Sequence, residues 1–148
     1  MINIFQTLCL ISEHCSILGT ELTAEQSPKN ITLVDYPERV PRYKGCHWVI
    51  QSYWQAAVKL TFHYFDLTPV DNIWFSDSSK TYTSLSDRIF ISPKFNGLNQ
   101  PPSVIYSMSK YLLVYLAGEK FSNPSRNYSG LSFQYSSFTP GKVKISYK

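Results

Sequence analysis

Short runs in which apolar residues alternate with polar ones constrain this chain most. The clearest is VKLTFHY, in which every second residue from Val58 to Phe62 is apolar. Similar runs follow one another from residue 46 to the end: HWVIQSYW, NIWFS, RIFIS, SVIYS, YLLVYL, GLSFQY and VKISY. A period of two is typical of half-buried β-strands, and prolines together with the Asn96-Gly97 dipeptide separate the runs. No segment has a sustained helical period. The pattern predicts an all-β antiparallel sandwich or barrel.

The composition indicates one globular domain. The chain has 148 residues, of which 43% are hydrophobic and only 16% charged, which indicates a folded chain and favours an extracellular location. The net charge is +4, but the basic residues are scattered, so we expect no nucleic-acid partner. We also expect no membrane insertion, since no segment approaches the roughly eighteen apolar residues of a membrane span.

Three cysteines, Cys9, Cys15 and Cys46, form no C-x-x-C motif, which excludes zinc ribbons and thioredoxin-like chemistry. The odd number leaves at least one thiol unpaired within the chain. Residues 1–14 include a short apolar stretch but have no positively charged start, so a secretory leader and a disordered N-terminus remain equal alternatives.

The sequence offers little for catalysis. His47 follows Cys46, and neighbours on a strand point to opposite faces, so a nucleophilic pair there is unfavourable. Asp66 and Asp71 flank one connection, which leaves a β-sandwich hydrolase as a remote alternative. We therefore predict that the chain is not an enzyme. Two sequons, at Asn30 and Asn127, predict N-glycosylation in loop or edge regions.

Several motifs together resemble those of the CUB domain family. The order and spacing match over about residues 19–138, and the first two motifs are specific when they occur together. The matching residues are Leu22-Thr23 and Ser27-Pro28; Tyr36-Pro37, Val40-Pro41, Cys46, Trp48 and Ile50; Val58, Leu60, Phe62 and Phe65-Asp66-Leu67; Leu112, Val114 and Leu116; and Gly130, Leu131, Phe133 and Tyr135.

The resemblance implies a jellyroll-type antiparallel β-sandwich of about 8–10 strands. It places a CUB-like domain at 15–138, after a leader or disordered N-terminus at 1–14. Residues 139–148 are expected to form a C-terminal extension, with a last strand of the domain as the alternative. It implies a secreted or ectodomain module, spermadhesin-like in being solitary, that binds proteins or glycans without catalysis. The alternative is a degenerate structural fragment of a larger multidomain ectodomain.

The resemblance also implies a disulfide and bears on a metal site. The family's first bridge corresponds to Cys15–Cys46, which closes a loop of about 31 residues and contributes roughly 3–4 kcal/mol; the second bridge is absent. Many CUB domains bind calcium through three acidic residues. Here the corresponding positions hold Thr68, Asp71 and Glu119. We therefore expect no resident metal, with calcium binding through Asp71 and Glu119 as the alternative.

The resemblance further implies that ligands meet loops at one end of the sandwich. The candidate loops are Asp66–Asp71, Gly118–Ser129 and Asn96–Pro102. Tyrosines bring a large contact area at small entropic cost. The candidate contact residues in and near these loops are Tyr64, Tyr82, Tyr128, Asp66, Asp71 and Glu119.

Overall fold

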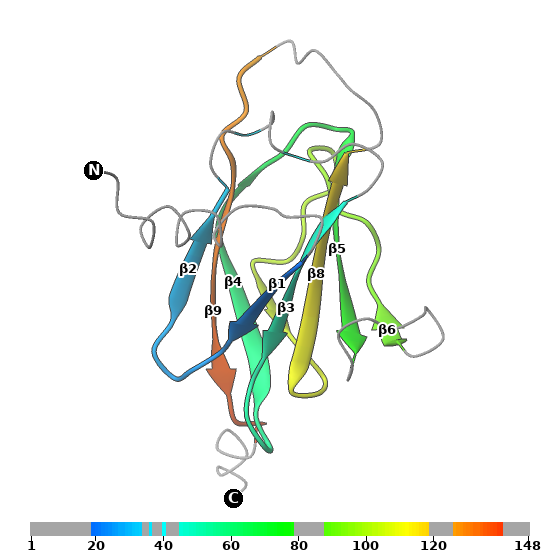
Figure 1. The fold of residues 1–148 in the computed structure, drawn as a ribbon. Helices are drawn as coiled ribbons and strands as arrows, with labels where there is room; N and C mark the ends of the chain where they lie inside the picture. Colours follow the sequence, from blue (N-terminus) through cyan, green and yellow to red (C-terminus); the bar gives the residue numbers. More distant parts are fainter. Residues whose placement is uncertain are drawn as a thin grey trace, which may run out of the picture.

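The chain folds into two β-sheets that face each other across one core (Figure 1). The computed structural model describes residues 19–33, 36, 40, 45–78, 88–118 and 126–140. These residues form strands and no helix. The nine strands are β1 (Thr20–Thr23), β2 (Lys29–Thr32), β3 (Cys46–Gln51), β4 (Ala57–Asp66), β5 (Asp71–Ser78), β6 (Arg88–Ile91), β7 (Val104–Tyr106), β8 (Tyr111–Gly118) and β9 (Gly130–Phe138).

One sheet has the strand order β1-β3-β8-β5-β6 and the other β2-β9-β4-β7. Every pairing but one is antiparallel; β1 runs parallel to β3, with Leu22 opposite Ile50. The alternating strands of a β-sandwich are therefore confirmed, and one parallel edge pair adds to the antiparallel arrangement. No helix of the described part is long and apolar enough to cross a membrane.

The core is made by the inward positions of the alternating runs. Trp48 is fully buried and meets Phe133 edge to face, with ring centroids 5.7 Å apart. Val58 and Leu60 are fully buried too, while Phe62 packs against both Phe133 and Phe75. Large apolar side chains of this kind each contribute roughly 1.5–3 kcal/mol on burial, so the alternating residues account for much of the stability.

Two local features differ from a simple alternation. The pairing of β4 with β9 shifts register between Phe62 and Tyr64, which returns Phe65 to the core side and leaves Tyr64 41% exposed. The run HWVIQSYW was predicted as one strand, but β3 ends at Gln51. A turn follows, in which Gln55 has a φ of 62°, a left-handed conformation that a strand does not contain.

Cys46 is fully buried in the core and disulfide-bonded, whereas its neighbour His47 lies on the outer face beside Tyr115. The candidate partners of Cys46, Cys15 and Cys9, lie outside the described residues. So do the run VKISY, the leader at 1–14, Tyr82 and Glu119.

Candidate functional site

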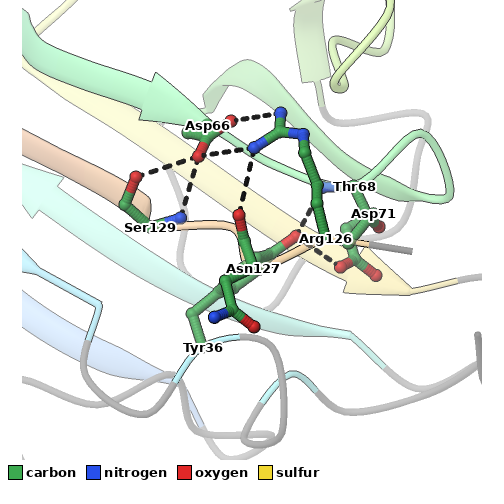
Figure 2. A network of polar contacts seen from close by, with 7 residues as sticks. All are labelled: Tyr36, Asp66, Thr68, Asp71, Arg126, Asn127 and Ser129. Atoms are coloured by element: carbon green, nitrogen blue, oxygen red, sulfur yellow. Dashed lines mark hydrogen bonds and ion pairs between the residues drawn. The ribbon is translucent and has the colours of Figure 1, made fainter. Parts of the chain in front are cut away.

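The end of the sandwich where β4 stops and β5 and β9 start carries a connected set of polar side chains (Figure 2). Asp66 is the last residue of β4 and lies opposite Gly130 in the pairing with β9. Asp71 is the first residue of β5, opposite Gly118 of β8. Strand pairing therefore fixes both aspartates at this end, which we call the polar end.

Asp66 holds the segment that leads into β9. Its Oδ1 accepts a hydrogen bond from Nη2 of Arg126 at 2.9 Å, and its Oδ2 accepts from the backbone N–H and the hydroxyl of Ser129, each at 2.9 Å. These contacts, led by the Arg126 guanidinium, lower the pKa of the Asp66 carboxyl from 3.8 to about 2. The carboxylate is thus ionised at neutral pH and pins Arg126–Ser129 to β4.

The same segment contains two further groups, the ring of Tyr128 and the side chain of Asn127. The Arg126 guanidinium lies 3.8 Å from the ring centre of Tyr128, an arrangement in which a cation is attracted by the ring face. Asn127 is exposed, and its backbone carbonyl accepts from Nη1 of Arg126 at 3.1 Å. The contacts of Asp66 and Arg126 therefore order a short loop in which Asn127 is exposed and Tyr128 is partly exposed.

Tyr36 links the connection between β4 and β5 to Asp71. Its hydroxyl donates to Oδ2 of Asp71 at 2.6 Å and accepts from the backbone N–H of Thr68 at 2.6 Å. Burial, reinforced by the hydrogen bond to Asp71, raises the pKa of the Tyr36 hydroxyl above its ordinary value, so it stays protonated and donates. Asp71 and Thr68 are themselves buried.

Two glycines allow the close approaches that this arrangement needs. Gly130 has a φ of +86°, and a side-chain carbon there would lie 3.0 Å from Cβ of Tyr36. At Gly97 such a carbon would lie 2.2 Å from the carbonyl oxygen of Leu67. The Gly97 N–H donates to the carbonyl of Thr68 at 3.2 Å, so the turn Asn96–Asn99 packs on the β4–β5 connection.

The structure therefore brings together at the polar end the described parts of all three loops predicted to meet ligand. Asp66, Asp71 and Asn127 lie there (Figure 2), and the contact with Arg126 places Tyr128 beside them, whereas Glu119 lies outside the described residues. Tyr64 is exposed on β4, and Asn30 is exposed on β2, where its Oδ1 lies 3.0 Å from Nε2 of His63. Sequence reasoning missed the roles of Tyr36, Arg126 and Ser129.

The described donors at the polar end fit calcium poorly. Calcium takes six to eight oxygens, several of them carboxylate oxygens, and the described residues contain no group of three acidic, histidine or cysteine side chains that could hold a metal. Thr68 stands where the CUB calcium motif has a glutamate, and its buried hydroxyl has no hydrogen-bond partner among the described residues. The Tyr36 hydroxyl occupies one oxygen of Asp71.

The two aspartates also differ from a hydrolytic pair. A glycosidase needs one carboxyl whose pKa is raised so that it donates a proton. The pKa of Asp66 is instead lowered to about 2, and each aspartate is bound by different partners (Figure 2). These contacts suit structural anchoring rather than proton transfer.

Comparison with known proteins identifies the family. The CUB domain profile matches residues 19–135. The chain belongs to the CUB domain family. A search of curated protein sequences gives no significant match.

CUB-containing structures share the fold. The full extracellular region of zebrafish Gpr126/Adgrg6 aligns at 25% identity with a TM-score of 0.57, covering 82% of this chain and 15% of that one. The CUB1-EGF-CUB2 domains of rat MASP-1 align at 19% identity with a TM-score of 0.59, covering 88% and 47%. The MASP-1 CUB2 domain bound to Ca²⁺ aligns at 22% identity with a TM-score of 0.54, covering 78% and 96%. The chain thus spans less than half of the first two structures, and CUB domains are typically extracellular protein-binding modules of larger proteins.

Proposed function

We propose that this chain is a non-catalytic, extracellular binding module that recognises a protein or glycan through its polar end. Membership of the CUB family over most of the chain carries the proposal. The anchored loop Arg126–Ser129 supports the choice of surface, because its backbone is already ordered by Asp66. A loop that is ordered before binding loses less conformational entropy when a ligand arrives.

The chemistry of the polar end favours recognition over reaction. Tyr128 offers an aromatic ring, which suits contacts to a protein surface or to a sugar. Asp66 accepts from Arg126 and Ser129, and Asp71 accepts from Tyr36, so both aspartates act as supports rather than as reacting groups. The described groups include no acid poised to give up a proton to a substrate.

The cellular setting is part of the proposal. We infer secretion or display outside the cell, with Cys15 as the partner of Cys46 and with glycans at Asn30 and Asn127. The two larger aligned structures contain further domains, which supports a place within a multidomain ectodomain. A glycan at Asn127 would stand beside Tyr128 and would favour approach of the ligand from the Tyr128 side.

A tetramerised, biotin-labelled form of the full chain tests the proposal on a glycan array and in a cell-surface pulldown. We expect saturable binding in at least one assay, and the heat-unfolded tetramer should not bind. Pretreating the cells with protease or with glycosidases separates a protein partner from a glycan. Blank results in both assays would contradict the proposal and leave the chain as a structural member of its family.

A further inference from the structure

A second feature lies away from the polar end, between the two sheets. A cavity of about 370 Å³ opens where β5 of one sheet faces β7 of the other. Its walls are mostly apolar and come from β5, the connection to β7, β7 itself and β8; they include Phe75, Phe95, Val104, Ile105 and Leu112. Small-molecule sites usually have volumes of about 300–1,000 Å³ and apolar walls with few polar groups.

One of those few polar groups is the carboxylate of Asp77. Asp77 lines the cavity, and it lies two residues from Phe75 and so on the inner face of β5. The residue is only 3% exposed. Its Oδ1 accepts from the Ser109 hydroxyl at 2.5 Å, but its Oδ2 is buried and has no hydrogen-bond partner among the described residues. A buried acceptor without a donor costs about 1–3 kcal/mol, and more when it is charged, which a bound donor would recover.

The described side chains around the cavity supply no positive charge to that carboxylate. The described residues that line the cavity include no lysine, arginine or histidine. The nearest lysines in sequence to the cavity lining turn elsewhere: Lys94 lies over the ring of Trp74 and Lys110 over the ring of Tyr111. Among the side chains that the structure describes, none supplies a cationic donor inside the cavity, so a cationic ligand suits this carboxylate.

The rim of the cavity is unusually apolar for an exposed surface. Met108 is 79% exposed and Tyr106 is half-exposed, and both line the cavity. Methionine is flexible and polarizable and adapts to irregular apolar partners. Contact between these apolar side chains and water is unfavourable, and a ligand with an apolar body would replace that contact.

We propose that this cavity is a binding site for a small amphiphilic amine, with the apolar body between the sheets and the protonated amine on Oδ2 of Asp77. The site is independent of the polar end. The combination of apolar walls and one unpartnered buried carboxylate selects cations over neutral or anionic molecules of the same shape. A charge-assisted hydrogen bond contributes about 1.5–3 kcal/mol, which corresponds to roughly tenfold or more in affinity.

Three probes of matched shape test the charge preference: 2-phenylethylamine, 2-phenylethanol and phenylacetate. Methyl resonances of Met108, Ile105 and Leu112 report on the cavity in an NMR titration of the full chain. We expect 2-phenylethylamine at millimolar concentration to shift these resonances, with at least about tenfold weaker effects from the other two probes. Equal shifts from all three probes, or none from the amine, would overturn the proposal.

Variants test the role of Asp77. Asp77→Asn keeps the shape but removes the charge and should weaken amine binding about tenfold. If that variant does not fold, Met108→Lys, which alters an exposed side chain and places a cation at the rim, should weaken it in the same direction. Glu25→Gln removes one charge from an exposed side chain near the opposite edge of the sheet and should leave binding unchanged. Undiminished amine binding in both Asp77→Asn and Met108→Lys would refute the site.

Discussion

Removing a single oxygen from Tyr36 tests how the polar end is held together. Tyr36→Phe keeps the ring that packs against Gly130, but it removes the hydroxyl that joins Asp71 to the Thr68 backbone N–H. Both groups belong to buried residues. The substitution therefore leaves a buried donor and a buried carboxylate oxygen each short of one partner.

The expected magnitude follows from those two losses. Leaving a buried polar group without its partner costs about 1–3 kcal/mol, so the two losses together should make the variant less stable by about 2–6 kcal/mol. For a domain of this size each kcal/mol lowers Tm by about 2–4 °C, which gives a fall of roughly 4–24 °C. Urea unfolding should show a lower midpoint with an unchanged slope, since the exposed surface is the same.

Tyr64→Phe is the matched control for Tyr36→Phe. Tyr64 is 41% exposed on β4, and removing its hydroxyl should change stability by less than about 0.5 kcal/mol. If Tyr36→Phe were as stable as this control, the Tyr36 hydroxyl would not bridge Asp71 and Thr68, and our account of the polar end would be wrong.

Three further predictions concern charge, metal and disulfide. The pKa of Asp66 is about 2 in the folded chain against 3.8 ordinarily, so its ionised form adds stability above about pH 4 that is lost as the pH falls toward 2. Because the ion pair with Arg126 is partly exposed, Asp66→Asn should lower the stability at neutral pH by only about 0.5–1 kcal/mol. Thermal melts of the two proteins should converge near pH 2, whereas a constant difference in Tm would count against this ion pair. Millimolar calcium should raise Tm by less than about 1 °C relative to magnesium, and a rise of several degrees would show a calcium site. Peptide mapping without reduction should recover Cys46 linked to Cys15, and a Cys9–Cys46 peptide would contradict that pairing.

The strands that the sequence predicts best are those whose alternation coincides with burial. The runs around Val58, Leu112 and Phe133 became long strands with those side chains in the core. The short edge strands β1 and β2 were not predicted, because four residues with few buried side chains carry little periodic signal. Their positions depend on pairing with β3 and β9, which are distant in the sequence.

The polar end was predictable only in part. The family motifs place Asp66 and Asp71 at strand ends, and pairing then brings those ends together. The ion pair between Asp66 and Arg126 joins residues 60 positions apart, and no local pattern reveals such a partner. The link from Tyr36 to Asp71 spans 35 positions; the tyrosine was visible as part of a motif, but its hydrogen bonds depend on the folded geometry.

The central claim is that ligand is recognised at the polar end, and paired surface variants test it most directly. Tyr128→Ser alters the polar end, while Trp54→Ser removes an exposed aromatic ring, 78% exposed, from the turn after β3 at the opposite end. Binding of both tetramers to cells that bind the parent chain should be measured by flow cytometry. We predict that Tyr128→Ser loses most of the binding and Trp54→Ser retains it. Retention by Tyr128→Ser together with loss by Trp54→Ser would contradict the account.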